Sequence, residues 1–205
     1  MMFENFTVKV GQDVPNFRLD VLDTAAVEFS EISLERLKAE RKWTILFFYP
    51  GDFTFVCATE FAAISAKYEE FKRLGAEVIT VSKDTKYAHL VWQRVEKMLE
   101  DVKYPMGADP TGNISRLFGV YDESSGLALR GTFIISPDGK LMNSEINYFN
   151  IGRNIDELMR KFKANRYLAN HDSEACPAQW AEEGDQTLTP SIKMVGKVYE
   201  QYGKE

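Results

Sequence analysis

The stretch WTILFFYPGDFTFVCATE, residues 43–60, leads from an apolar run through a turn to a cysteine, Cys57. Residues 43–49 form a near-continuous aliphatic and aromatic run, which is typical of a strand buried on both faces of an α/β sheet. From Cys57 onward, apolar residues recur at helical spacing, and Gly75 follows as a helix end. The stretch therefore predicts a central strand, a loop and a helix that starts at the cysteine.

Strand and helix patterns alternate along the chain up to about residue 168. Strands are predicted at 76–83, 130–136 and 141–148, and helices at 87–99, 114–119 and 155–168. Residues 104–113 are predicted to be a turn-rich connection, and the turn PDGK makes the last two strands a hairpin. The alternation favours an α/β fold, a central mixed sheet flanked by helices, within one domain over residues 1–168.

Residues 169–205 differ in character and are predicted to form a C-terminal arm. Residues 169–191 are polar, with few aliphatic side chains, and contain prolines and a glycine that break any helix. Pro177 also biases Cys176 toward an extended conformation. Because such a segment has no core of its own, we expect it to lie on another surface, with a short helix at 192–202.

Composition narrows the classes of partner and the compartment. The chain has 205 residues, with 25 Lys and Arg against 31 Asp and Glu, a net charge of −6. Without a basic stripe, neither nucleic acid nor an anionic membrane is an expected partner. No apolar run is long enough to span a bilayer, and the first residues lack the features of a leader. We therefore expect a cytoplasmic protein.

The sequence offers few ligands for a metal or an organic cofactor. It has two cysteines and two histidines, no CxxC, no HExxH and no glycine-rich phosphate loop. His89 lies one turn before Trp92 on a predicted helix, which favours a structural role over a catalytic one. A metal role is therefore disfavoured, and a redox role or a packing role remains for Cys57.

The position of Cys57 allows two interpretations. A cysteine in the first helical turn faces unpaired amides and the positive end of the helix dipole, which favour the thiolate. Thr54 can place a hydroxyl beside that sulfur, as a donor or as a helix cap. Alternatively, Cys57 is a small buried hydrophobic residue. A low thiol pKa alone adds little speed, because nucleophilicity falls with pKa at a Brønsted slope of ~0.4–0.5. A fast cysteine needs fixed hydrogen-bond donors that point at the substrate. Thr54 and Arg130 can supply them, but Thr54 can equally be a plain helix cap and Arg130 a surface residue.

Two motifs resemble one protein family specifically. Pro50, Thr54 and Cys57 form the pattern P-x-x-x-T-x-x-C, and ACPAQW surrounds Cys176. Together they resemble the typical two-cysteine peroxiredoxins. Supporting stretches are VGQDVPNF, VSKDTKYAHLVW, DPTGNISRLFGVY, RGTFIISPDG and GRNIDELMR, so the resemblance runs through nearly the whole chain.

The resemblance implies a thioredoxin-like fold and a thiol peroxidase that needs no metal and no organic cofactor. Cys57 would be the peroxidatic cysteine, which attacks a hydroperoxide and becomes a sulfenic acid. Thr54 and the Cys57 amide would hydrogen-bond the peroxide, and Arg130 would stabilise the thiolate and the developing charge. Pro50 would shield the sulfenate, and Glu60 would orient the arginine.

The resemblance also implies partners. Cys176 of a second subunit would resolve the sulfenic acid to an intersubunit disulfide, which a dithiol protein, thioredoxin or a dedicated flavoprotein reductase, would reduce. We expect a homodimer that assembles into a decamer of five dimers. Two alternatives stay open at this point: a holdase chaperone, and an intrachain disulfide between the same cysteines.

The sequence departs from the family pattern at a few positions. Ala58 follows Cys57 where the family often has proline. ESSGLAL, residues 123–129, lacks the Gly-Gly-Leu-Gly insertion, and the C-terminus lacks the Tyr-Phe pair, that mark members sensitive to overoxidation. We therefore expect an arm that unfolds readily and a cysteine that resists sulfinic inactivation.

Overall fold

The computed structural model describes residues 6–203, which form two compact units, one ending at Ile155 and one beginning at Asp156. The first unit is built on a seven-stranded sheet in the order β2-β1-β5-β4-β3-β8-β9, with β6 and β7 paired separately. The strands are β1 (Arg18–Asp23), β2 (Glu28–Ser33), β3 (Trp43–Phe48), β4 (Ala76–Ser82), β5 (Met106–Ala108), β6 (Tyr121–Asp122), β7 (Leu127–Ala128), β8 (Arg130–Ile135) and β9 (Leu141–Asn147). β3, β4 and β5 are parallel neighbours and the other pairs are antiparallel, so the predicted mixed sheet is confirmed.

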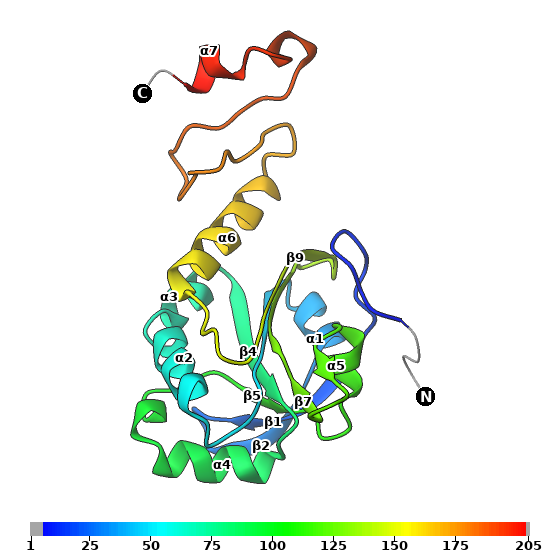
Figure 1. Ribbon diagram of the computed structural model, residues 1–205, viewed down its shortest axis with the longest axis vertical. Helices are drawn as coiled ribbons and strands as arrows, with labels where there is room; N and C mark the ends of the chain where they lie inside the picture. The colour runs from blue at the N-terminus through cyan, green and yellow to red at the C-terminus, as the bar shows by residue number, and fades with distance from the viewer. Residues whose placement is uncertain (1–5, 204–205) are drawn as a thin grey trace. The chain divides into compact units, whose positions relative to one another are not determined.

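The helices of this unit cover both faces of the sheet. They are α1 (Leu34–Ala39), α2 (Phe55–Ser65), α3 (Tyr68–Arg73), α4 (Lys86–Val95), the 3-10 turn η1 (Lys97–Leu99) and α5 (Asn113–Leu117). α2 and α3 lie on one side of the sheet, and α1 and α5 lie on the other (Figure 1).

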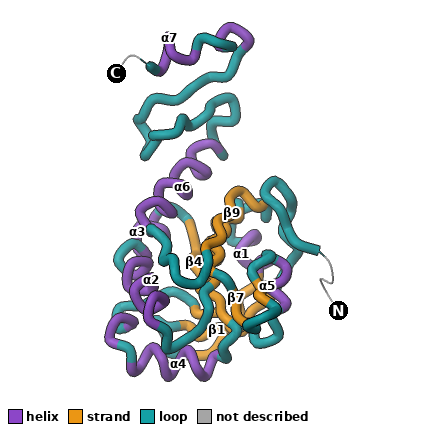
Figure 2. Tube along the Cα trace, in the orientation of Figure 1, coloured by secondary structure: helices purple, strands orange, loops and turns teal. Residues whose placement is uncertain are grey.

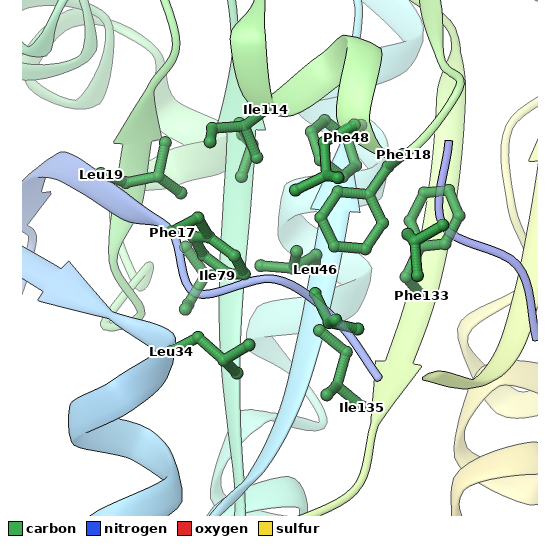
Figure 3. Close-up of a cluster of buried hydrophobic side chains, with 14 of the residues drawn as sticks. Phe17, Leu19, Leu34, Leu46, Phe48, Ile79, Ile114, Phe118, Phe133 and Ile135 are labelled. Carbon is green, nitrogen blue, oxygen red and sulfur yellow. The ribbon is translucent and has the colours of Figure 1, made fainter. Parts of the chain in front are cut away.

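The strand β3 is central, as its apolar run predicts, and every one of its residues is buried. Because side chains alternate along a strand, Leu46 and Phe48 point into one core, between the sheet and the α1 and α5 side. Figure 3 shows this cluster of aliphatic and aromatic side chains, including Phe17, Leu19, Leu34, Leu46, Phe48, Ile79, Ile114, Phe118, Phe133 and Ile135.

A second, aromatic cluster fixes α2. Phe61 of α2 lies 4.9 Å from the ring of Tyr49, 5.0 Å from Trp92 and 5.7 Å from Tyr104, measured between centroids. The Tyr104 hydroxyl also donates to the carbonyl of Phe61 at 2.9 Å. The helix that carries Cys57 is therefore held firmly at its middle.

Several elements differ from the prediction. The helix expected from Cys57 toward Gly75 is two helices, α2 and α3, and Tyr68 at the start of α3 turns its hydroxyl to Glu77 at 2.8 Å. The hairpin of β1 and β2 was not predicted, because β2 is mostly exposed and lacks an apolar alternation. β5 has only three residues and lies inside the predicted connection 104–113.

The second unit contains α6 (Ile155–Leu168) apart from its first residue, the 3-10 turn η2 (Ile192–Met194) and α7 (Val198–Tyr202). The predicted helix at 155–168 is confirmed, whereas the expected helix at 192–202 is divided into η2 and α7. Figure 2 shows that the chain between α6 and η2 is loop. The division at residue 168 stays a prediction, and its outer ends, 1–5 and 204–205, lie outside the described residues. Between residues 6 and 203, no helix is long and apolar enough to cross a membrane.

Candidate active site

Cys57 is the third residue of α2, and its side chain is fully buried. Thr54 occupies the N-cap position with an extended backbone, but its side chain makes no capping hydrogen bond. Its hydroxyl instead donates to the carbonyl of Gly51 at 2.7 Å. The expected helix cap by the Thr54 side chain is therefore not made. The amides of the first turn of α2 can donate to other acceptors instead.

Arg130, the first residue of β8, reaches the sulfur. Its Nη1 lies 3.2 Å from Cys57 Sγ and 2.6 Å from Glu60 Oε2. Its Nε donates to the carbonyl of Phe149 at 2.7 Å, which fixes the plane of the guanidinium. Both Arg130 and Glu60 are buried, so three of the expected site residues lie together as the sequence motif implies.

Arg153 completes the cluster and was not predicted. Its Nε and backbone amide each donate to Glu60 Oε1 at 2.9 Å, and its Nη2 donates to Oε2 at 3.0 Å. Its guanidinium carbon lies 3.1 Å from the ring centroid of Phe47, and its Nη1 donates to the carbonyl of Gly131 at 2.9 Å. Burial lowers the pKa of Arg153. One signal in the sequence pointed to Arg153, its position in the family-like stretch GRNIDELMR. Periodicity could not identify it, because the residue lies in an irregular segment before α6.

The charges of this cluster leave a surplus positive charge beside the sulfur. Arg130 and Arg153 bring two buried positive charges, and Glu60 compensates one of them. An uncompensated buried charge is costly. Since Arg130 touches Sγ directly, this surplus positive charge faces the reacting atom.

A second buried network holds the loop between β3 and α2. The Tyr49 hydroxyl donates to Asp52 Oδ1 at 2.7 Å, and Asp52 Oδ2 lies 2.8 Å from Nδ1 of His89. The amide of Asp52 donates to Asp84 at 2.8 Å. Burial raises the pKa of Asp52. His89 is fully buried in this network, as its predicted structural role requires, and Pro50 is buried in the same loop.

Cys176 belongs to the second unit, where it is partly buried, and both cysteines are free thiols. Burial and the charge of Glu174 raise the pKa of the Cys176 thiol, and Arg160 opposes them. Among the described residues, no group of three or more His, Cys, Asp or Glu side chains is placed to hold a metal ion.

Comparison with known proteins identifies the class to which this fold and site belong. The profile of the AhpC/TSA family matches residues 10–144, and the chain belongs to that family. The chain is 43% identical to alkyl hydroperoxide reductase C of Amphibacillus xylanus and 41% identical to that of Staphylococcus aureus strain N315, each over 92% of this chain and 98% of the relative. It is thus a homologue of alkyl hydroperoxide reductase C, a peroxiredoxin enzyme.

Solved structures agree. The crystal structure of Enterococcus faecalis AhpC matches with a TM-score of 0.77 at 42% identity, covering 82% of this chain and 98% of that one. The reduced 2-Cys peroxiredoxin of Plasmodium vivax matches with a TM-score of 0.85 at 28% identity, covering 91% of this chain and 95% of that one. The predicted peroxiredoxin fold is therefore confirmed.

Proposed function

We propose that the protein reduces hydrogen peroxide and organic hydroperoxides through Cys57, as an antioxidant peroxidase. The observation that carries this proposal is the contact of 3.2 Å between Arg130 Nη1 and the buried Sγ at the start of α2. A buried sulfur with a fixed positive donor has the charge stabilisation that a fast nucleophilic cysteine needs.

In the first step, the Cys57 thiolate attacks the distal oxygen of the hydroperoxide. The S–O bond forms, the O–O bond breaks, and the alkoxide or hydroxide that leaves takes up a proton. Arg130 faces the charge that moves from sulfur to oxygen, and Glu60 fixes Arg130. Because the Thr54 hydroxyl donates its own proton to Gly51, its oxygen serves as an acceptor for the peroxide proton.

The amide of Cys57 serves as a donor to the peroxide, since Thr54 does not cap it. Pro50, buried in the loop before α2, shields the sulfenic acid from bulk water. Each of these roles follows the family motif, and the burial of Cys57 supports a dry reaction centre.

In the second step, Cys176 of a second copy attacks the sulfenic sulfur. The S–S bond forms, the S–OH bond breaks, and the hydroxide leaves as water with the thiol proton. Disulfide geometry brings the two Cα atoms to roughly 4.4–6.8 Å. Because Cys57 is fully buried in a helix, the first turn of α2 unwinds before the sulfurs meet. A dithiol protein, thioredoxin or a flavoprotein reductase, then reduces the disulfide.

The sheet edge supports the expected homodimer. β9 is an edge strand of the sheet and pairs there with β8. Ile146 is 47% exposed, and Tyr148 just beyond the strand is 66% exposed. An exposed edge strand with apolar side chains is a template for strand pairing. A second copy that pairs antiparallel with β9 covers this edge.

A second apolar surface supports assembly beyond the dimer. It consists of Phe29, Phe53, Tyr87 and Val91, all exposed on the first unit. The rings of Phe29 and Tyr87 contact each other at 5.1 Å between centroids. A ring of dimers requires two separate surfaces on each subunit, each of which contacts another copy of the chain. We therefore include a decamer in the proposal. We also propose a cytoplasmic location, where both thiols stay reduced.

Two cysteine variants test the proposal. In Cys57→Ser, peroxide consumption in the presence of thioredoxin or a flavoprotein reductase should disappear. In Cys176→Ser, Cys57 should still be oxidised, but no covalent dimer should form on a nonreducing gel. Peroxide consumption at the wild-type rate in Cys57→Ser would refute the proposal, and a chaperone assay on the same variant measures any holdase activity separately.

A further inference from the structure

The turn that carries Cys176 is tied to α6 at both of its ends. The Tyr167 hydroxyl donates to Glu174 Oε2 at 2.9 Å, and Arg160 Nη1 donates to the carbonyl of Trp180 at 2.8 Å. Arg160 and Tyr167 are seven residues apart, about two helical turns, so they lie on one face of α6. Cys176 is thus flanked by one anchor two residues before it and another four residues after it.

Arg160 is itself oriented by its neighbour Glu157. Its Nε lies 2.6 Å from Glu157 Oε2, and its Nη2 lies 3.0 Å from Oε1. This bidentate pair fixes the plane of the guanidinium and aims the remaining donor, Nη1, at the turn. A lysine keeps the charge but cannot make these three contacts at once.

Local contacts also hold the rest of the turn. Ala175 and Leu188 exchange two backbone hydrogen bonds, and the amide of Trp180 donates to the carbonyl of Pro177 at 3.1 Å. The ring of Trp180 lies 5.5 Å from that of Tyr167. However, Trp180 Nε1 is buried without a hydrogen-bond partner in the described structure, which disfavours the docked turn. The hydrogen bond from Arg160 therefore ties the end of the turn beyond Cys176 to α6.

We propose that Arg160 is a positioning residue for the step in which Cys176 forms the disulfide, because it holds the Cys176–Trp180 turn on α6. This inference rests on the proposed function, in which Cys176 attacks the sulfenic acid of a second copy. A docked turn restricts the directions in which Sγ can approach, so less freedom is lost when the sulfurs meet. Arg160 touches neither sulfur, so it acts through the backbone of the turn.

The charges around Cys176 give Arg160 a second effect, which also favours disulfide formation. The thiolate is the attacking species. Burial and Glu174 raise the pKa of Cys176, and Arg160 lowers it. The Tyr167 hydroxyl and the Thr187 side chain hydrogen-bond Glu174, and the ring of His171 stacks on that of Tyr167 at 4.0 Å between centroids. Arg160 is therefore the cation that counteracts Glu174 at this thiol.

Three full-length variants test the inference: Arg160→Gln, Arg160→Lys and, as a control, Arg166→Gln, which removes one exposed positive charge from the same helix. Stopped-flow mixing with hydrogen peroxide measures the oxidation of Cys57, and alkylation followed by nonreducing gels measures disulfide formation from pH 6 to pH 9.

Oxidation of Cys57 should be unchanged in all three variants, which also shows that they fold. Disulfide formation in Arg160→Gln should be about tenfold slower, with its pH midpoint shifted upward and more Cys57 sulfinate at equal peroxide. In Arg160→Lys the midpoint should return toward the wild-type value while the rate stays low. Arg166→Gln should match the wild type.

Wild-type disulfide rates with a wild-type midpoint in Arg160→Gln would overturn the inference. That result differs from failure of the proposed function, which would appear as no oxidation of Cys57 in the wild-type protein.

Discussion

At the scale of single residues, Arg153 supplies the surplus positive charge beside Cys57. Arg153→Met leaves Glu60 paired with Arg130 alone, so the surplus positive charge that faces the attacking sulfur is lost. We expect the first step to slow about tenfold, equivalent to ~1.4 kcal/mol. Because a partner of a buried ion pair is removed, unfolding should also become easier by about 3 kcal/mol. Stopped-flow peroxide oxidation and urea unfolding measure the two effects.

The exposed pair of Arg18 and Glu31, 3.4 Å apart, provides the matched control. Arg18→Met should change stability by less than about 1 kcal/mol and leave the first step unchanged. Equal peroxide rates in Arg153→Met and the wild type would show that the second arginine does not act on the sulfur.

Thr54 allows a second test of the site. Thr54→Val keeps the shape but removes the oxygen that we expect to accept the peroxide proton, so the first step should slow by roughly 10²-fold, the magnitude of losing a preorganised polar group. Thr54→Ser keeps the hydroxyl and its contact with Gly51, and should stay within a few-fold of the wild type. Stopped-flow oxidation of Cys57 distinguishes them; a valine variant as fast as the serine variant would contradict this role.

The family resemblance predicted Cys57, Thr54, Arg130 and Glu60 as site residues, because each lies at a fixed spacing from Cys57 or in a recognisable stretch. Arg153 was not predicted, because its contacts with Glu60 span 93 residues and its own segment has no periodicity. Similarly, the sequence allowed Thr54 to be a cap or a donor to sulfur, and only the loop geometry gives its proton to Gly51.

At the scale of elements, the first turn of α2 controls how easily Cys57 becomes accessible. In a helix that begins at Phe55, the Ala58 amide makes the first helical hydrogen bond, to the carbonyl of Thr54. Ala58→Pro removes that donor and should ease unwinding by about 1 kcal/mol, so disulfide formation should become about fivefold faster. Quenched alkylation and nonreducing gels measure this rate.

Ala58→Ser keeps the amide and is the control. The first step should be unchanged in both variants, and sulfinate formation at high peroxide should fall in Ala58→Pro. Slower disulfide formation in Ala58→Pro would mean that unwinding of this turn does not limit the resolving step.

The elements that the sequence predicted well are those whose burial is complete or regular. β3 is a continuous apolar run because the layers on both sides of the sheet bury its two faces, and α6 keeps a helical period over 14 residues. β2 and β5 escaped, because the exposed residues of β2 carry no alternation and β5 is too short for a period to show. The strand conformation of β2 comes from its hairpin with β1, and that of β5 comes from pairing with β1 and β4, which are distant in sequence.

At the scale of the whole molecule, the proposed intersubunit disulfide makes the second step depend on the dimer, whereas the first step uses groups of a single chain. Ile146→Lys places a charge on the exposed edge strand β9, where strand pairing with a second copy would bury it. We therefore expect the variant to sediment as a smaller species, to oxidise Cys57 at the wild-type rate, and to form covalent dimer at least tenfold more slowly. Val10→Lys changes a residue of similar exposure, 55%, outside the sheet and should leave all three unchanged. Rapid covalent dimer formation by a monomeric Ile146→Lys variant would place the subunit contact elsewhere than at β9.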